Sequence, residues 1–331
     1  MNHRSTAPTP ARSPDSSKSI GMRPIFVGGC ERSGTTLLGS LLGASPGAIT
    51  IPESRFRINA LIDSARLATE LDGGDYLDLM MRDSLFALWS LEQPLKSAKP
   101  PRYRDAVESI VAAYAHSRAC ESPRVWIDHT PINVRYALEM EKHFPEGRFI
   151  HLIRDGRAVS ASMLDLDWGP NSIWKAARHW TDRIAVGLAL ESSEIGRKVI
   201  RVRYEDLVSD TDATMRRLCG FCEIEFDPEM LEGGRFAVPP HMKVQNQLVG
   251  HRPEAHRIHG WRLRLSRREI EIFESAAGEL MRLLGYDPIF GIAARPPSSN
   301  ELIKFAAQEW YRTKIFNKPR KRRRLSLSKP A

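Results

Sequence analysis

The segment from Pro24 to Thr36 limits the fold of this chain more than any other. It begins with a short apolar run that ends in two glycines, continues through Cys-Glu-Arg-Ser-Gly, and passes into an apolar stretch at residues 37–44. This order is typical of a buried strand, a tight loop and the first turns of a helix. Such a connection directs backbone N–H groups and the positive end of the helix dipole at one point. The segment therefore predicts an anion-binding loop between a strand and a helix.

The loop differs from a nucleotide-binding P-loop in its cation. Gly29 and Gly34 are spaced as in a P-loop, and two hydroxyl residues, Thr35 and Thr36, follow. A P-loop also needs a Lys directly before the hydroxyl residue, to reach the β- and γ-phosphates of the nucleotide. This chain has no Lys there, and its cation lies earlier, at Arg32. The difference argues for another anionic ligand and leaves a nucleotide kinase with a degenerate loop as the alternative.

Short apolar runs that alternate with amphipathic stretches indicate the fold class. We expect strands at residues 24–28, 124–127, 148–153 and 198–203. Buried strands separated by helices favour an α/β fold, a P-loop-like three-layer α/β/α arrangement with a central, mainly parallel sheet. Ligands bind beyond the carboxyl ends of such strands, so the loops there are the candidate site. We expect helices at residues 35–44, 56–70, 76–91, 104–118, 133–143, 156–166, 172–192, 211–221 and 266–284.

The net charge of +9 is concentrated at the C-terminal end of the chain. Residues 295–331 hold 11 of the 49 basic side chains and two of the 40 acidic ones, so the remainder carries no net charge. A neutral body argues against nucleic acid as a partner. The sequence thus divides into a disordered leader at 1–22, an enzyme-like domain at 23–294 and a basic tail at 295–331.

The basic tail has two interpretations. An amphipathic helix is expected at residues 300–316, and a basic cluster follows at 318–324. The tail could dock on an anionic membrane surface, where each basic residue contributes about 1 kcal/mol. It could equally be a helix packed on the body and followed by solvated charges. The chain has no run of 18 apolar residues, so no membrane span is expected. Its four cysteines favour a reducing cytoplasm over a disulfide scaffold.

Two further segments offer a general base. Glu53 lies in Ile-Pro-Glu-Ser-Arg, just past the first predicted helix. A carboxylate beside an anion site could remove a proton from an acceptor hydroxyl, a role worth roughly 10²–10⁴ in rate. The alternative is a surface pair between Glu53 and Arg55. His129 directly follows the second predicted strand and could act as a base or donate to a transferring group. The alternative for His129 is a structural role.

Two later segments offer phosphate and base contacts. Arg154 ends the third predicted strand, and Ser162 follows eight residues later on a helix. Both side chains could reach a phosphate, although the serine could also face solvent. Tyr204 follows the last predicted strand. Its ring could stack on a nucleotide base or pack in the core.

These motifs together resemble the sulfotransferases that use 3′-phosphoadenosine 5′-phosphosulfate (PAPS). In that family an Arg-Ser-Gly-Thr-Thr loop, here Arg32–Thr36 with Ser33 inside it, holds the 5′-phosphosulfate. An Arg and a Ser eight residues later, here Arg154 and Ser162, hold the 3′-phosphate. The resemblance runs from residue 24 to about 288 and is closest to the tyrosylprotein and carbohydrate sulfotransferases. In the tyrosylprotein branch a Glu-x-Arg lies 21 residues past the loop Arg, the position of Glu53.

Two residues depart from the pattern of that family. Glu31 stands where many members have Pro, and His129 stands where they have Lys. A protonated His129 could supply the missing cation at the sulfuryl group.

The resemblance implies in-line transfer of a sulfuryl group from PAPS to a hydroxyl or amine, with Glu53 as the base and no metal. Arg32, and His129 if protonated, would stabilise the charge that develops. The acceptor stays open among protein tyrosine, carbohydrate, lipid and small metabolite. A nucleotide-binding, membrane-associated module without turnover is the alternative from another class.

Overall fold

A five-stranded parallel sheet forms the centre of the protein. We describe it from a computed structural model that covers residues 21–67, 69–91, 95, 99–234, 236–243, 245–247 and 249–326. The strand order is β2-β3-β1-β4-β5. The predicted leader falls outside these residues as far as residue 20, as do the last five residues of the tail. The strands are β1 (Arg23–Gly29), β2 (Ala48–Ile51), β3 (Val125–Asp128), β4 (Arg148–Ile153) and β5 (Val199–Arg203).

The sheet confirms the predicted α/β class and adds one strand. The four predicted strands are present, and every pairing between neighbours is parallel. The additional strand is β2, whose Ile51 lies opposite Asp128 of β3. Because parallel strands end at the same edge, β2 brings the following residues, Pro52 and Glu53, to the carboxyl edge of the sheet. The unpredicted strand thus positions a predicted site residue.

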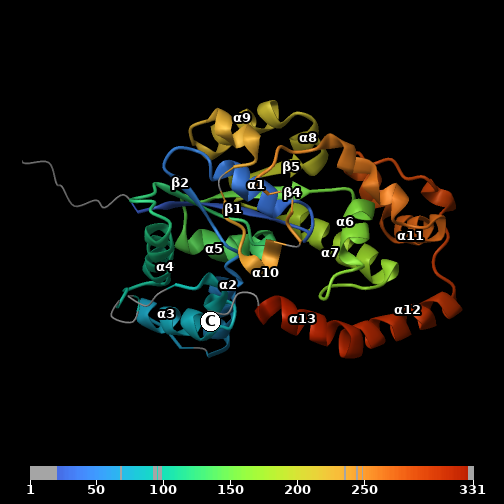
Figure 1. Ribbon diagram of the computed structural model, residues 1–331, viewed down its shortest axis with the longest axis horizontal. Helices are drawn as coiled ribbons and strands as arrows, with labels where there is room; N and C mark the ends of the chain where they lie inside the picture. Colours follow the sequence, from blue (N-terminus) through green and yellow to red (C-terminus); the bar gives the residue numbers. More distant parts are fainter. Residues whose placement is uncertain are drawn as a thin grey trace, which may run out of the picture.

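Helices cover both faces of the sheet, because side chains of each strand alternate between two cores. Ile25 and Val27 of β1 face a core that includes α1 (Thr35–Leu42), while Phe26 between them faces the other core. Figure 1 shows α1, α8 and α9 on one face and α4 and α5 on the other. The bounds of these helices are α4 (Tyr103–Ser117), α5 (Ala137–His143), α8 (Tyr204–Ser209) and α9 (Thr211–Cys222).

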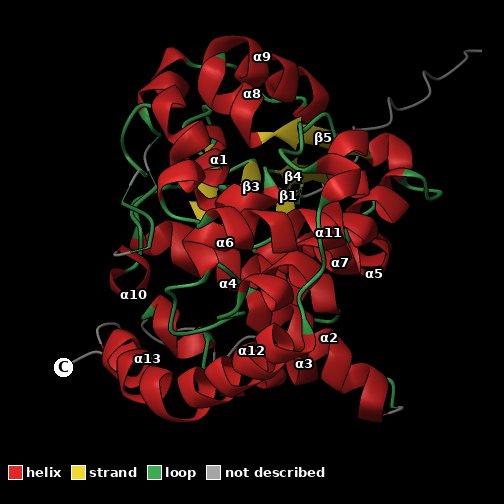
Figure 2. Cartoon of the chain, turned by 90° about the vertical axis from the view of Figure 1, so that its right-hand side faces the viewer, coloured by secondary structure: helices red, strands yellow, loops and turns green. Residues whose placement is uncertain are grey.

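A third apolar core lies beyond the end of β4. It is built by α6 (Gly156–Met163), α7 (Ile173–Glu191) and α11 (Arg267–Leu283) around Trp180 and Phe273. Gly156 opens α6, and a Cβ there would lie 2.3 Å from the Phe273 ring. Figure 2 shows α11 and α7 beside each other near β4. This core fixes the helix that follows Arg154. The remaining helices on the body are α2 (Arg55–Leu67), α3 (Gly73–Arg82) and α10 (Pro240–Lys243).

Two of the predicted helices are each divided into an α-helix and a separate 3-10 segment. The helix expected at 76–91 ends at Arg82, and a separate 3-10 turn follows at Phe86–Trp89. Asp83 adopts an extended conformation, and its carboxylate accepts a hydrogen bond from the Leu85 backbone N–H, which replaces the next helical bond. The helix expected at 133–143 begins as a 3-10 helix at Pro131–Tyr136 before α5.

The basic tail forms helices that pack on the body. It comprises α12 (Ser299–Tyr311), a π-helical segment (Arg312–Phe316) and α13 (Asn317–Ser326). The Glu309 carboxylate accepts hydrogen bonds from the backbone N–H groups of Asn171 and Ser172 at 2.7 Å, at the N-terminal end of α7. The expected amphipathic helix is present as α12. Within the described residues, no helix combines the length and apolar character needed to cross a membrane.

Candidate active site

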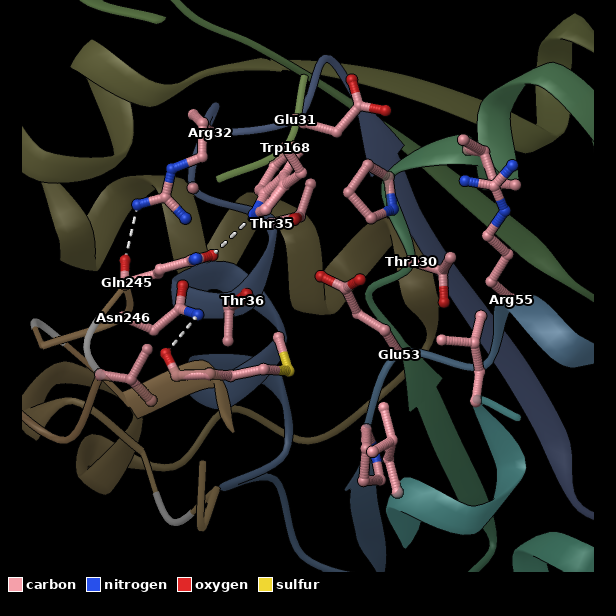
Figure 3. Close-up of a pocket in the computed structure, with 18 of the residues that line it drawn as sticks. Glu31, Arg32, Thr35, Thr36, Glu53, Arg55, Thr130, Trp168, Gln245 and Asn246 are labelled. Atoms are coloured by element: carbon pink, nitrogen blue, oxygen red, sulfur yellow. Dashed lines mark hydrogen bonds between the residues drawn. The ribbon is translucent and has the colours of Figure 1, made fainter. Parts of the chain in front are cut away.

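A pocket of about 470 Å³ lies at the carboxyl edge of the sheet. Residues that follow each of the five strands contribute to its lining, as expected for ligand sites of parallel sheets. Figure 3 shows Arg32, Thr35 and Thr36 on one side of this pocket and the Glu53 carboxylate pointing into it from another. The sequence-predicted residues that line the pocket are Arg32, Gly34, Thr35, Thr36, Glu53, Arg154 and Tyr204.

The loop after β1 has the geometry of an anion site. Gly34 is the N-cap of α1 with φ 101°, in the left-handed region that favours glycine, and a Cβ there would lie 2.7 Å from the Tyr204 ring. No side chain of the described residues caps α1, so the N–H groups of its first turn are available to a ligand. Ser33 is fully buried, and its hydroxyl has no hydrogen-bond partner among the described residues. The loop therefore presents several donors that an anion could satisfy.

Arg32 is held in place by two contacts from distant segments. Its Nε donates to Ser162 Oγ at 3.1 Å, and its Nη2 donates to the Gln245 carbonyl at 2.5 Å. Its φ of 71° is in the left-handed region that non-glycine residues rarely adopt. Burial and the charge of Arg154 lower the pKa of Arg32. Ser162 does not line the pocket itself but reaches the site through Arg32.

Arg154 lies between the loop and Tyr204. Its Nη1 donates to the Arg32 carbonyl at 3.1 Å, and its guanidinium carbon lies 4.0 Å from the centre of the Tyr204 ring. Within the described residues, its buried Nε has no hydrogen-bond partner. The Tyr204 ring thus contacts a cation on one face and the helix N-terminus at Gly34. Tyr204 is 3% exposed, so its ring packs beside the anion loop.

The residues next to Glu53 belong to a buried network of hydrogen bonds around Asp128, which holds the Glu53 loop in place. Asp128 at the end of β3 pairs with Arg57 at 2.5 Å and accepts hydrogen bonds from Ser54 and Thr130. The Ser54 backbone N–H also donates to Thr130 Oγ1 at 2.8 Å. These bonds tie the start of α2 to β3, so the Glu53 backbone has a defined position.

The environment of Glu53 favours its protonated form. The side chain is half-buried, and burial together with the charges of Asp128 and Glu31 raises the pKa of Glu53 to about 7. Within the described residues, no ion pair joins Glu53 to Arg55, the alternative that the sequence left open. A carboxylate with a pKa near neutrality has the acid strength suited to a general base.

His129 does not reach the pocket. Its side chain is fully buried, packs against Phe236 and lies against Gly39 of α1. Neither ring nitrogen has a hydrogen-bond partner among the described residues. Burial lowers the pKa of His129 to about 4, so the ring is neutral near pH 7. This placement supports the structural alternative for His129 and not the protonated cation that the sequence suggested.

Glu31, the other departure in the loop, forms ion pairs behind it. Its carboxylate contacts His179 at 2.8 Å and Arg183 at 3.0 Å, both on α7. Although burial acts in the opposite direction, the His179 hydrogen bond and the Arg183 charge lower the pKa of Glu31 to about 2. Among the described residues, Cys30, Glu31 and His179 are the one group whose ligand atoms lie close enough to share a metal ion. The Arg183 cation already compensates the Glu31 charge.

Several pocket residues carried no readable signal in the sequence. Trp168 donates from Nε1 to Gln245 Oε1 at 3.2 Å, next to the Gln245 carbonyl that accepts from Arg32 (Figure 3). These residues lie in loops without a recognisable motif. Lys321 and Arg324 of α13 also line the pocket, although their basic cluster resembled a solvated appendage.

Comparison with known sequences identifies a family. A profile described as "Sulfotransferase family" matches residues 24–228. Protein-tyrosine sulfotransferase A of Caenorhabditis elegans is 24% identical over 321 residues, which cover 89% of this chain and 77% of the relative. Protein-tyrosine sulfotransferase 1 of Danio rerio is 28% identical over 218 residues, covering 62% of this chain and 55% of the relative. The chain thus spans about half the length of the Danio relative.

Comparison with solved structures supports the same fold. The sulfotransferase domain from the Synechococcus PCC 7002 olefin synthase superposes with a TM-score of 0.59 and 22% identity, covering 84% of this chain and 99% of that domain. The sulfotransferase domain from the curacin biosynthetic pathway gives a TM-score of 0.57 and 19% identity, covering 80% of this chain and 98% of that domain. Because both sequence identities are below 25%, the structural similarity shows a shared fold and no more.

Proposed function

The chain belongs to the sulfotransferase family and is an enzyme of sulfuryl transfer, and on this premise we propose that PAPS is its donor and a protein tyrosine its acceptor. The family match covers the loop after β1 and the segments that carry Glu53, Arg154 and Tyr204. A nucleotide kinase is not favoured.

We assign the 5′-phosphosulfate of the donor to the loop Arg32–Thr36. Within the described residues, the Ser33 hydroxyl has no partner and no side chain caps α1. Both features support this assignment, because both offer donors to an anion. The 3′-phosphate is assigned to Arg154 and Ser162. The Arg154 Nε, which is buried and has no partner in the part of the chain that the structure describes, supports that assignment, since a buried donor without a partner is costly unless a ligand satisfies it. Tyr204 then packs beside the nucleotide and holds the Arg154 guanidinium.

The transfer needs alignment and charge neutralisation more than covalent help, as in phosphoryl transfer. The acceptor oxygen attacks the sulfur in line, a new O–S bond forms, and the bond from sulfur to the 5′-phosphate oxygen breaks. The leaving group is 3′-phosphoadenosine 5′-phosphate. Arg32 and the loop N–H groups stabilise the charge on that leaving oxygen. Glu53 accepts the proton of the acceptor hydroxyl, and none of these steps requires a metal.

A tyrosine acceptor is supported by the names of the relatives and by the pocket lining. Several relatives are protein-tyrosine sulfotransferases. The pocket beside Glu53 is lined by Pro52, Leu85, Leu88 and Trp89, which suit an aromatic ring. The Trp89 Nε1 donates to the Glu53 carbonyl at 3.2 Å, so the apolar wall and the base are held together.

The observation that carries the proposal is one pocket holding both the Arg32 loop and a carboxylate with a pKa of about 7. The test is sulfur transfer from ³⁵S-labelled PAPS to a tyrosine-containing peptide. Matched peptides with Phe or Ser in place of Tyr serve as controls, and Mg-ATP replaces PAPS in a parallel reaction. We expect label only in the tyrosine peptide. Label in the serine peptide would refute tyrosine selectivity, and transfer from ATP alone would refute the choice of donor.

We also propose that the protein resides in the cytoplasm and touches an anionic membrane through the outer face of α12. All four cysteines are free thiols, which suits a reducing compartment. Ile303, Trp310 and Tyr311 are exposed by half or more, next to basic side chains. Co-sedimentation with phosphatidylserine vesicles should fall in Trp310→Ser and stay unchanged in Leu263→Ser, an exposed residue outside the tail. Equal binding to neutral phosphatidylcholine vesicles would exclude this surface.

A further inference from the structure

The C-terminal helix α13 forms part of the active-site pocket. Lys321, Arg324 and Leu325 line the same cavity as Arg32 and Glu53. Figure 1 shows α13 running back from α12 to end near α2, the helix that starts just after Glu53. The family match ends at residue 228, so these side chains come from a part of the chain that the family comparison does not describe.

Specific contacts hold α13 in this position. Arg324 pairs with Asp167 at 3.0 Å, and the two side chains are 20% and 6% exposed. Asn317, which is buried, donates from Nδ2 to Asn171 Oδ1 at 3.0 Å. Arg320 donates to the Asp165 carbonyl at 2.9 Å. All three partners lie in the loop between α6 and α7, so α13 contacts the body through one short segment.

That segment also connects α13 with the anion loop. Trp168, the neighbour of Asp167, donates to Gln245, whose carbonyl accepts from Arg32. Ser162, near the end of α6, accepts from the same guanidinium. Arg324 and Arg32 are therefore anchored on opposite ends of one short stretch of chain, and both face the pocket that holds Glu53.

The two carboxylates whose charges act on Glu53 have ion-pair partners of their own. Asp128 below it pairs with Arg57, and Glu31 pairs with His179 and Arg183. Arg324 has an anchoring partner in Asp167. Burial raises the pKa of Glu53, and the charges of Arg32 and Arg324 both act against that rise. Among the described residues, the charged groups that line the pocket or act on Glu53 are Glu31 and Arg32 from the loop after β1, Arg55 at the start of α2, Asp128 at the end of β3, Arg154 after β4, and Lys321 and Arg324 from α13.

We propose that Arg324 is a positioning residue of the active site, a tail-borne cation that Asp167 holds against the pocket and that favours the ionised form of Glu53 for proton removal from the acceptor. The role rests on the proposed function of Glu53 as the base. Arg324 itself needs no contact with the reacting atoms. Its effect on the rate is expected to appear mainly at low pH, where Glu53 would otherwise be protonated.

The test compares the pH dependence of turnover in the full chain and in point variants. In Arg324→Gln the acid limb should move to higher pH, so that turnover at pH 6 falls roughly two- to tenfold more than at pH 8.5. Arg323→Gln is the matched control, because it removes the same charge from an exposed neighbour on α13 that does not line the pocket. Arg324→Lys should keep the wild-type profile, since it keeps the cation. In a Glu53→Gln background, Arg324→Gln should have no further pH-dependent effect.

Three outcomes would overturn the proposal. These are a profile for Arg324→Gln equal to that of Arg323→Gln, an equal loss of turnover at every pH, and a shifted profile in Arg324→Lys. A readout without turnover separates this inference from the proposed function. The difference in unfolding temperature between wild type and Glu53→Gln, measured as a function of pH, reports the titration of Glu53. When both proteins also carry Arg324→Gln, the midpoint of this titration curve should move to higher pH. A wild type inactive with PAPS would refute the proposed function, while an unmoved midpoint would refute the role of Arg324.

Discussion

Replacing Glu53 with Gln should stabilise the protein while removing most of its activity. The carboxylate is half-buried beside Asp128 and Glu31, and its pKa is raised to about 7, whereas a Glu in an unfolded chain has a pKa of about 4.3. Between these values the folded protein binds more protons than the unfolded chain, so its stability falls as pH rises. Gln has nearly the same shape as Glu and no charge, so the variant does not lose stability through ionisation of a buried carboxylate.

The size of the effect follows from the pKa difference. One pH unit corresponds to about 1.4 kcal/mol, so Glu53→Gln should gain about 3.6 kcal/mol in free energy of unfolding at pH 8 and only about 1 kcal/mol at pH 5. For a chain of this length, about 1 kcal/mol corresponds to roughly 2 °C in unfolding temperature. We therefore expect a rise of roughly 7 °C at pH 8 and roughly 2 °C at pH 5. Turnover with labelled PAPS should fall roughly 10²–10⁴-fold.

Urea or thermal unfolding at both pH values measures the stability. Glu121→Gln is the control, because Glu121 is exposed and its replacement should change stability equally little at pH 5 and pH 8. Affinity for 3′-phosphoadenosine 5′-phosphate should stay near that of the wild type, since Glu53 has no assigned contact with the nucleotide. A stability gain that is absent, or equal at the two pH values, would refute the reasoning about the ionised carboxylate. Unchanged turnover would refute the role of Glu53 as the base.

Three further substitutions probe the loop after β1 and its neighbours. Arg32→Ala should abolish calorimetrically detected binding of 3′-phosphoadenosine 5′-phosphate, and binding equal to wild type would contradict the donor assignment. Gly34→Ala should weaken the same binding at least roughly tenfold, because its Cβ would lie 2.7 Å from the Tyr204 ring at a φ of 101°; normal affinity would show that the loop adapts. His129→Phe should keep turnover within roughly threefold of wild type, since the buried ring lies outside the pocket; a large loss confined to turnover would restore a catalytic role for His129.

The parts of the fold that the sequence predicted are those with recognisable local patterns. The four predicted strands are mostly apolar, as is typical of the centre of a parallel sheet. The missed strand β2 is four residues long, the same length as β3, so length alone does not explain why it was missed. Its place in the sheet depends on pairing with β3, a contact between distant segments. The strand that delivers Glu53 to the pocket was therefore invisible to local reasoning, although Glu53 itself was named.

The site shows the same division between local and distant information. Arg32, Gly34 and Arg154 follow strands, so the topology of the sheet alone predicted where they lie. His129 also follows a strand, but its side chain turns into the core beside Phe236, and sequence spacing gives no information on that direction. Trp168 and Gln245 reach the site from loops whose course depends on packing. No local pattern in the sequence could have found them.

The tail shows why net charge alone is a poor guide to function. Its basic cluster led to two interpretations, a membrane contact or a solvated charge run, and both treated the cations as equivalent. In the structure they differ, because Arg323 is exposed while Arg324 is largely buried against Asp167 and lines the pocket. A cation that lines the same pocket as Glu53 is less screened by solvent, whereas exposed cations are screened within about 8–10 Å at physiological salt. If Arg324 acts on Glu53 as proposed, raising the salt concentration should weaken vesicle binding through the exposed cations and leave the acid limb of turnover nearly unchanged.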